Sequence, residues 1–221
     1  MVPKNSRVVD IGSDHAYIPI YLVQQGIIRS AIASEITSGP RAISKSDIAE
    51  NSLSNEIETR LGDGFAGINK DDHIDTAVIA GMGGQLIIKI LSDAKDDILP
   101  TIDNLILEPN TDIPAVRTWL SENNYQIKNE SIVEDGSHIY EVIYAVKAKQ
   151  IIPLNKQQIM FGPILLKTKT ATFVKKWSDQ LRRSKFMYNN LQNAKGPEPE
   201  KIKYAKNRMN VIKEVLNVDN R

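Results

Sequence analysis

The chain has 221 residues, 41% of them hydrophobic and 25% charged, with a formal net charge of +1; this composition supports a buried core and excludes wholesale disorder, and the length excludes an assembly of many domains. The absence of cysteine excludes disulfides, thiolate zinc sites and cysteine nucleophiles. Apolar runs fall short of the ~18 residues that a membrane-spanning helix needs, and Met1 is not followed by an export leader, so we expect a cytoplasmic protein without membrane contact.

The first 150 residues alternate short β-branched runs with helical stretches, a pattern typical of a mostly parallel sheet flanked by helices. We predict five such strands, at residues 7–11, 30–34, 56–61, 74–80 and 104–107. A predicted helix at 113–123 precedes two β-rich runs, 125–134 and 139–147, which are separated by Asp135-Gly136-Ser137 and predict a hairpin. Ligands of doubly wound sheets bind beyond the carboxyl ends of the strands, so we expect the site in the loops that follow them.

The first predicted strand runs into a turn that contains Asp10, Gly12 and Asp14. Gly12 permits a sharp bend and lets a ligand approach the amides at the start of the next helix. The other two glycines of the G-x-G-x-x-G dinucleotide fingerprint are absent. Asp10 and Asp14 would repel a pyrophosphate and favour a ligand with a positive centre. We therefore expect a sulfonium or ammonium ligand, and a structural turn without ligand is the alternative.

Carboxylates also stand at the ends of the next two predicted strands. Glu35 ends the second strand, 23 residues after Gly12, where a carboxylate commonly accepts hydrogen bonds from ribose hydroxyls. Asp63, between Gly62 and Gly64, follows the third strand and is able to accept a hydrogen bond from an exocyclic amine such as that of adenine. An ordinary turn aspartate is equally compatible with this second pattern.

A glycine-rich segment, Ala80-Gly81-Met82-Gly83-Gly84, follows the fourth predicted strand and opens onto an apolar helix at 86–91. Such a turn lets a ligand lie close to the main chain. Together with the carboxylates at neighbouring strand ends, it favours adenosine with a cationic substituent as the ligand.

The two parts of the chain differ in charge. Residues 1–150 carry a net charge of −9 and residues 151–221 a net charge of +10. A dense basic segment favours a polyanionic partner, because each lysine or arginine near a phosphate releases a counterion. A solvated helix surface and docking of this segment on the acidic part are the alternatives. We place the domain boundary here, with residues 1–150 as the ligand-binding domain and 151–221 as a basic helical domain.

The basic segment has the periodicity of two helices. Apolar residues recur every three or four positions from Val174 through Trp177 to Leu191, and again from Ile202 to Leu216. Gly196-Pro197-Glu198-Pro199 lies between the two runs and supplies a helix stop and a helix start. We therefore predict an antiparallel helical hairpin in which the aromatic and Met side chains are packed.

Several motifs occur in an order that matches a known family: Asp-Ile-Gly-Ser-Asp-His-Ala-Tyr-Ile-Pro at 10–19, Arg-Leu-Gly-Asp-Gly at 60–64, Ala-Gly-Met-Gly-Gly at 80–84 and Leu-Glu-Pro-Asn at 107–110. Over residues 7 to about 147 the chain resembles the bacterial tRNA (adenine-22-N1)-methyltransferase family, and its tail resembles that family's helical coiled-coil domain. The resemblance implies an α/β, Rossmann-like class I methyltransferase that uses S-adenosylmethionine to methylate N1 of an adenine in the D-arm region of tRNA. It also implies that tRNA contacts both the basic C-terminal helices and the active-site face.

Carried over position by position, the resemblance assigns the cofactor to residues at the strand ends: Asp10, Gly12, Asp14, Glu35, Asp63, Gly64, Gly81, Met82 and Gly83. It places Gly12 and Asp14 at the amino-acid end of the cofactor, Glu35 on the ribose and Asp63 with Gly64 on the adenine. The segment from Gly81 to Gly83 is expected to line the methyl-donor pocket. The Asn/Asp-Pro-Pro-Tyr/Phe motif of many amino-group methyltransferases is replaced here by Ala-Gly-Met-Gly-Gly, so the target nitrogen is presented differently.

Three further residues are implied at the target base: Asn110, which would orient a flipped adenine, and Tyr17 and His15, which would assist it. A stacked aromatic ring contributes ~1–3 kcal/mol per base. The alternative for His15 is a structural role, in which a histidine at the start of a helix is bonded to the backbone. His73 and His138 have no partner at ligand spacing, so no metal is expected.

The chain departs from the family pattern at two places. Glu108 stands where relatives usually carry Gln, and a carboxylate accepts a hydrogen bond from the adenine amino group but cannot donate one. Only six residues precede the first strand, where relatives carry a helix that helps to cover the site, so looser cofactor or substrate binding is expected. Two alternatives stay open: a methyltransferase for a small metabolite, with a hairpin that serves dimerisation, and a non-catalytic RNA-binding module.

Overall fold

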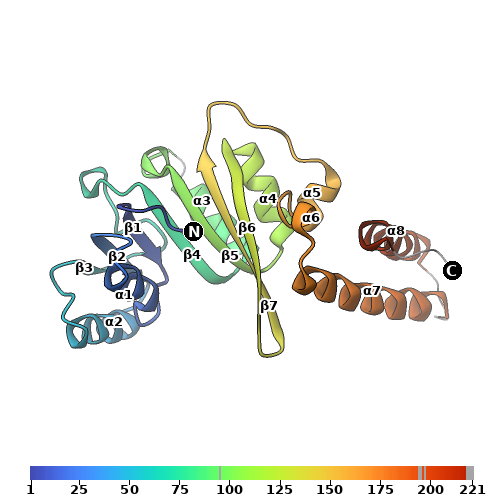
Figure 1. The fold of residues 1–221 in the computed structure, drawn as a ribbon, viewed down its shortest axis with the longest axis horizontal. Coiled ribbons are helices and arrows are strands. Elements are labelled where there is room, and N and C mark those ends of the chain that lie inside the picture. Colours follow the sequence, from blue (N-terminus) through green and yellow to red (C-terminus); the bar gives the residue numbers. More distant parts are fainter. Residues whose placement is uncertain (95, 194–195, 197, 218–221) are drawn as a thin grey trace. The chain divides into compact units, whose positions relative to one another are not determined.

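The computed structural model describes residues 1–94, 96–193, 196 and 198–217 (Figure 1). The chain forms two compact units. The first consists of Met1–Ser131 and Tyr140–Leu154, and the second of Ile132–Ile139 and the residues from Asn155 onward. The tip of one β-hairpin therefore belongs to the second unit. Among the described residues, no helix combines the length and the apolar character needed to cross a membrane.

The first unit is built on a seven-stranded sheet with the order β3-β2-β1-β4-β5-β7-β6. Its strands are β1 (Arg7–Ile11), β2 (Ser30–Glu35), β3 (Ile57–Leu61), β4 (Thr76–Gly83), β5 (Asn104–Thr111), β6 (Tyr125–Asp135) and β7 (His138–Lys147). Neighbouring strands from β3 to β5 are parallel, whereas β7 runs antiparallel to β5. This confirms the predicted parallel sheet closed by an antiparallel hairpin.

Four helices of the first unit connect these strands: α1 (Tyr17–Gln24), α2 (Ser38–Glu50), α3 (Gly84–Asp93) and α4 (Ile113–Glu122). Short 3₁₀ helices occur at η1 (Lys70–Asp72) and η2 (Leu99–Thr101). Parallel strands buried on both faces read as apolar runs, which is why the sequence marks them well. On one face, Val8, Ala31 and Val78 pack with Ile20 of α1 and Ile48 of α2, while α3 packs against β4, β5 and α4.

Strands β4 and β5 are longer than the sequence predicts. We expected them to end at Ala80 and Leu107, but pairing continues from Met82 to Pro109 and from Gly83 to Thr111. The register shifts on both sides of Met82, so the irregular, glycine-containing edge bends without losing its partner strand. The expected loop residues Gly81–Gly83 and Asn110 therefore lie on strands.

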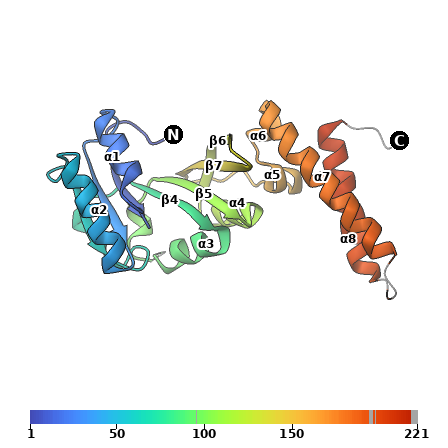
Figure 2. The ribbon, with the colours of Figure 1, turned by 90° about the horizontal axis from the view of Figure 1, so that it is seen from below.

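The second unit is helical outside the hairpin tip. It contains α5 (Lys156–Phe161), α6 (Leu165–Thr168), α7 (Ala171–Gln192) and α8 (Pro199–Leu216). As predicted, α7 and α8 form a side-by-side antiparallel pair (Figure 2). Pro199 is the first residue of α8, where its missing N–H costs nothing. Pro197 of the predicted turn lies outside the described residues.

The core of the second unit is an aromatic cluster. The rings of Phe161 and Trp177 lie 4.3 Å apart, centroid to centroid, and both pack near Phe173. Burying each such side chain is worth ~1.5–3 kcal/mol. The buried stripe of α7 begins at Phe173, and Val174, the first position of the predicted apolar periodicity, is exposed. The first contact of the helix is set by α5, which the periodicity of α7 does not reveal.

Candidate active site

The carboxyl ends of β1 to β5 lie at one edge of the sheet because these strands are parallel (Figure 1). Each of the five ends carries predicted site residues. Individual contacts connect the ends in the order β3, β2, β1, β4 and β5.

The turn after β1 has an unusual backbone. Gly12 has a φ of +68°, and Asp14, His15 and Ala16 also have positive φ values, of 38°, 61° and 53°. Positive φ in residues other than glycine costs ~1–3 kcal/mol each and persists only where neighbouring structure enforces it. Here the N–H of Gly12 donates to the carbonyl oxygen of Ser34 at 2.8 Å. Hydrogen bonds to residues of β2 therefore hold the main chain of this turn just before α1.

Asp10 lies beneath this turn. Its carboxylate is buried and accepts a hydrogen bond from the Ser13 hydroxyl at 2.5 Å. Burial raises the pKa of Asp10 to about 7; the Ser13 hydrogen bond opposes this shift and the charge of Glu35 adds to it. Asp14, by contrast, is exposed. The two aspartates, which the sequence suggested as equivalent charges, thus have different environments, and Asp10 supports the turn from below.

Glu35 joins the turn after β1 to the end of β2. It is buried, and its Oε1 accepts the backbone N–H of Asp14 at 2.7 Å and the Ser44 hydroxyl at 3.4 Å. The Glu35 carbonyl oxygen accepts the N–H of Gly62, which follows β3, at 2.9 Å. Glu35 therefore connects the turn after β1, the end of β2 and the start of the loop after β3.

The loop after β3 carries Asp63 and Gly64. Asp63 is exposed, and Gly64 has a φ of +58°. A Cβ on Gly64 would lie 3.0 Å from the side chain of Ile90 in α3. A cavity of about 160 Å³ lies between this loop and α3, with Asp63, Gly64, Ile90 and Asp93 among its lining residues. The residues predicted to bind adenine therefore border a cavity lined by both carboxylates and apolar side chains.

The ends of β1, β4 and β5 meet around Gly12 and Gly81. A Cβ on Gly12 would lie 2.3 Å from the Cε of Met82, so the two residues are in contact. Gly81 has a φ of +73°, and its N–H donates to Glu108 Oε2 at 2.7 Å. Glu108, the family departure, thus holds the glycine bend of β4. Asn110 is exposed near the end of β5.

The other two candidates for the target base, His15 and Tyr17, stack on each other. Their ring centroids are 5.1 Å apart and the rings are 8° from parallel. His15 Nδ1 lies 2.7 Å from Asp47 Oδ2 of α2, so its partner is a carboxylate and not the backbone. Tyr17 is 66% exposed. The structure brings these two rings together beside the strained turn, whereas Asn110 lies on β5, two strands along the sheet.

Sequence reasoning missed several residues that shape this edge. Ser13 and Asp47 each hold a predicted site residue through a side chain, and Glu108, which the sequence singled out for the adenine amino group, instead accepts the N–H of Gly81. The contacts of Asp47 and Glu108 join residues more than 25 positions apart. Only Ser13, three residues after Asp10, lies close enough in the sequence to have been suspected. Within residues 1–94, 96–193, 196 and 198–217, no three His, Asp or Glu side chains are grouped as a metal site.

Two cavities larger than the one beside Asp63 lie near the amino end of β5. One of about 230 Å³ is lined by Leu99, Tyr125 and Lys147, and a neighbouring one of about 520 Å³ by Asp103, Lys147 and Lys149. They contain none of the predicted site residues. Strand-end chemistry, and not cavity size, therefore identifies the candidate site.

The parallel strands with glycine bends and carboxylates at their carboxyl edge, closed by an antiparallel β7, define a Rossmann-like methyltransferase fold. The sequence pattern of the tRNA (adenine(22)-N(1))-methyltransferase family matches residues 8–214. The chain therefore belongs to this family.

Individual relatives agree. The tRNA (adenine(22)-N(1))-methyltransferase of Bacillus subtilis (strain 168) is 36% identical to the chain over 97% of this chain and 92% of the relative. A Streptococcus pneumoniae protein solved in complex with S-adenosyl-L-methionine is 33% identical, with a TM-score of 0.89 over 98% of this chain and 94% of its own. M. capricolum TrmK, solved with S-adenosyl-homocysteine, is 30% identical, with a TM-score of 0.86 over 99% and 94%.

Proposed function

We propose that this protein transfers the methyl group of S-adenosylmethionine to N1 of adenine 22 in tRNA. Membership of the tRNA (adenine(22)-N(1))-methyltransferase family makes it an S-adenosylmethionine-dependent tRNA adenine-N1 methyltransferase. The observation that carries the proposal at the level of residues is the continuous set of contacts between the ends of β1 to β5, which gathers the candidate site residues at one edge. Since the substrate is tRNA, we place the reaction in the cytoplasm.

The edge fits the proposed cofactor in shape and charge. Met82 packs directly on Gly12, where a Cβ would lie 2.3 Å from the Met82 Cε, so a glycine at this position lets the end of β4 contact the turn after β1. Glu35 stands at the end of β2, where ribose hydroxyls are commonly bound, and Asp63 beside the 160 Å³ cavity offers an acceptor for the adenine amino group. Asp14 contributes an exposed negative charge near the turn, which favours a cationic ligand.

The reaction needs alignment more than proton transfer. When bound, S-adenosylmethionine supplies a methyl group activated by the sulfonium. Adenine N1 carries a lone pair, so no side chain has to remove a proton before the attack. Asn110 offers a donor and an acceptor on one amide, which match N7 and the 6-amino group of adenine and leave N1 free. Holding two reactants in near-attack geometry supplies ~7–11 kcal/mol.

His15 and Tyr17 are assigned a supporting role at the target base. The exposed ring of Tyr17 provides a stacking surface, and His15 stacks on its other side at 5.1 Å. The contact between His15 and Asp47 fixes the imidazole. In this proposal His15 positions Tyr17 and does not act as a general base.

We assign binding of the tRNA body to the α7 and α8 pair. The segment from residue 151 onward has a net charge of +10, and the basic side chains of Arg183, Lys185, Lys203 and Lys206 are exposed. Phe186 and Tyr204 are 70% and 62% exposed among them, contrary to the expectation that the aromatic residues of the tail are packed. Basic side chains interleaved with exposed aromatic rings are typical of surfaces that bind RNA backbone and unpaired bases.

The direct test uses the full chain, labelled S-adenosylmethionine and transcribed tRNA. We expect one methyl group per tRNA, mapped by a reverse-transcription stop at position 22, and no product with a tRNA that has G at that position. Asn110→Ala should lower the turnover number and leave cofactor affinity unchanged. Transfer to a small metabolite with intact tRNA left unmodified, or cofactor binding without turnover, would each reject the proposal in favour of one of the alternatives.

A further inference from the structure

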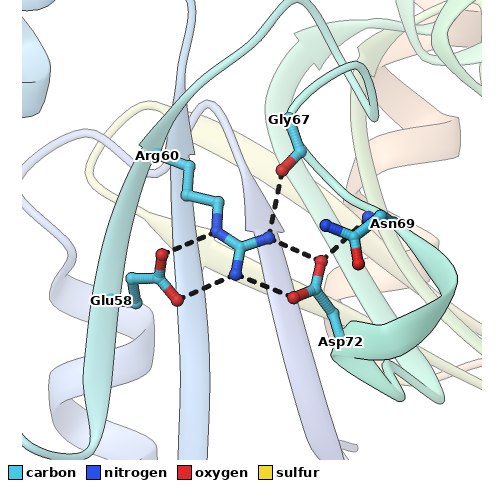
Figure 3. A network of polar contacts seen from close by, with 5 residues as sticks. All are labelled: Glu58, Arg60, Gly67, Asn69 and Asp72. Carbon is cyan, nitrogen blue, oxygen red and sulfur yellow. Dashed lines mark hydrogen bonds and ion pairs between the residues drawn. The ribbon is translucent and has the colours of Figure 1, made fainter.

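Arg60, the fourth residue of β3, is the centre of a polar network on the first unit (Figure 3). A guanidinium has five N–H donors, and all five have acceptors here. Nε and Nη2 donate to the two carboxylate oxygens of Glu58, both at 2.8 Å. Nη1 and Nη2 donate to the two oxygens of Asp72 at 2.5 and 2.7 Å, and Nη1 also donates to the Gly67 carbonyl at 3.1 Å.

Two of these three partners belong to the segment that leaves β3 and carries Asp63. Gly67 lies in the middle of that segment, and Asp72 ends η1 behind it. Asp72 Oδ2 also accepts the backbone N–H of Asn69 at 2.8 Å. The side chains of Arg60 and Asp72 are only 20% and 9% exposed, so water competes little for these hydrogen bonds. The third partner, Glu58, is on β3 itself, and its carboxylate accepts hydrogen bonds from Arg60.

The path of the same segment is tightly constrained near Arg60. A Cβ on Gly62 would lie 2.5 Å from the backbone N of Gly67, and a Cβ on Gly67 would lie 2.8 Å from the carbonyl oxygen of Leu61. The two glycines therefore close residues 62–67 into a loop whose backbone packs on itself. Asp63 and Gly64 lie inside this loop. Arg60 fixes its closing end, while the Gly62 N–H is fixed to Glu35 at its opening end.

We propose that Arg60, through Asp72 and Gly67, is a positioning residue for the adenosine half of the cofactor, because it preorganises the loop that presents Asp63. This inference rests on the proposed function, in which Asp63 and Gly64 contact the cofactor adenine. A loop that is ordered before binding spares the ligand the cost of ordering it. A rigid loop also keeps the Asp63 carboxylate within hydrogen-bond reach of the adenine amino group.

The charges of the network support this positioning role of Arg60 at physiological pH. The hydrogen bonds from Arg60 lower the pKa of Glu58 and of Asp72. Both carboxylates therefore stay ionised as acceptors well below neutral pH. Lysine in place of Arg60 would keep the charge, but its three donors on one nitrogen cannot span Glu58, Asp72 and Gly67.

The test compares Arg60→Lys and Asp72→Asn with the matched control Glu58→Gln, which removes a charge from the network without touching the loop. We expect both test variants to bind S-adenosyl-homocysteine at least 10-fold more weakly by calorimetry. They should raise the KM for S-adenosylmethionine while the turnover number at saturation stays within 2-fold of the wild type. Glu58→Gln should change the affinity less than 3-fold. Amide hydrogen exchange in residues 62–69 should accelerate in the test variants alone.

A double variant separates this inference from the proposed function and from a general loss of structure. If Arg60 acts through Asp63, Arg60→Lys combined with Asp63→Ala should bind no more weakly than Asp63→Ala alone. Additive losses, or wild-type affinity of Arg60→Lys and Asp72→Asn while Asp63→Ala is impaired, would overturn the role of Arg60. Wild-type affinity of Asp63→Ala would instead reject the cofactor site itself. Thermal unfolding of each variant confirms that binding is measured on folded protein.

Discussion

The two units of this protein organise their functional residues in different ways. In the first unit, individual polar contacts such as those of Glu35 and Glu108 hold strained glycine bends and turns at strand ends. In the second unit, the apolar cluster around Trp177 holds two helices whose outer faces carry exposed charges. In the proposed function, the first unit therefore depends on the placement of a few atoms, whereas the second depends on the sum of many similar charges.

The largest effect is expected from the summed charges. Replacing Arg183, Lys185, Lys203 and Lys206 together by Ala should weaken tRNA binding by about 10²- to 10³-fold at 0.1 M salt, because each lost phosphate contact removes ~0.7–0.9 from the slope of log K against log salt. Filter binding over a salt series measures this. Affinity for S-adenosyl-homocysteine should not change, and an unchanged salt slope would show that tRNA binds elsewhere.

In the first unit, the loss of one carboxylate, that of Asp63, should have an effect on ligand binding that is nearly as large. Asp63→Ala should weaken cofactor binding by about 10- to 100-fold, since a hydrogen bond to a charged group contributes ~1.5–3 kcal/mol. The control is Asp71→Ala, which removes an exposed carboxylate from the 3₁₀ helix η1. Calorimetry should separate the two variants, and tRNA binding should be equal in both. Equal cofactor affinities would count against the assignment of Asp63.

The buried carboxylate beneath the β1 turn predicts a pH dependence of stability. The pKa of Asp10 is about 7 in the fold and 3.8 in its ordinary environment, so the folded state retains a proton that the unfolded chain releases. Stability from this group is present below pH 3.8 and is lost as the pH rises through about 7. Without cofactor, unfolding free energy should fall on the order of 2 kcal/mol between pH 5 and pH 8.

Asp10→Asn tests this assignment, because it keeps the shape of the side chain and removes its titration. Denaturant unfolding of the variant should show a flatter pH profile over the same range. Asp14→Asn, which changes an exposed carboxylate two residues beyond Gly12, should keep the wild-type profile. A wild-type profile in Asp10→Asn would assign the pH dependence to another group.

The smallest effect is expected from a comparison of two glycines with similar positive φ values. Gly12 and Gly26 have φ values of +68° and +62°, but only a Cβ on Gly12 meets another residue, at the flexible end of Met82. Gly12→Ala and Gly26→Ala should each cost about 1 kcal/mol of stability from backbone strain. Only Gly12→Ala should also weaken cofactor binding. Equal cofactor affinity in both variants would mean that Gly12 serves the turn alone.

The sequence predicts the strands of the first unit well because their information is local. In β1, for example, residues 8–11 are buried on both faces of the sheet, and Glu35 ends β2 as expected from its position after the apolar run. The ends of β4 and β5 were wrong because pairing between Met82 and Pro109 depends on a partner strand that lies 27 residues away. Local patterns do not contain that information.

The same limit applies to the site and to the second unit. The glycines and carboxylates of the strand ends are recognisable in the sequence, but the contacts of His15 with Asp47 and of Arg60 with Asp72 join separate segments. In α7 the periodicity predicts a helix, yet the face that is buried begins at Phe173 because Phe161 of α5 packs there. The presence of a helix could be predicted from the local sequence, whereas the face that it buries could not.

A crystal structure of the full chain with S-adenosyl-homocysteine would show directly whether the cofactor lies at the carboxyl edge of β1 to β5. We expect the ribose hydroxyls at Glu35, the adenine at Asp63 and Gly64, and the amino-acid end at the turn after Gly12. Ligand density in the cavities beside Lys147, with the carboxyl edge of β1 to β5 left empty, would show that the cofactor site is assigned wrongly.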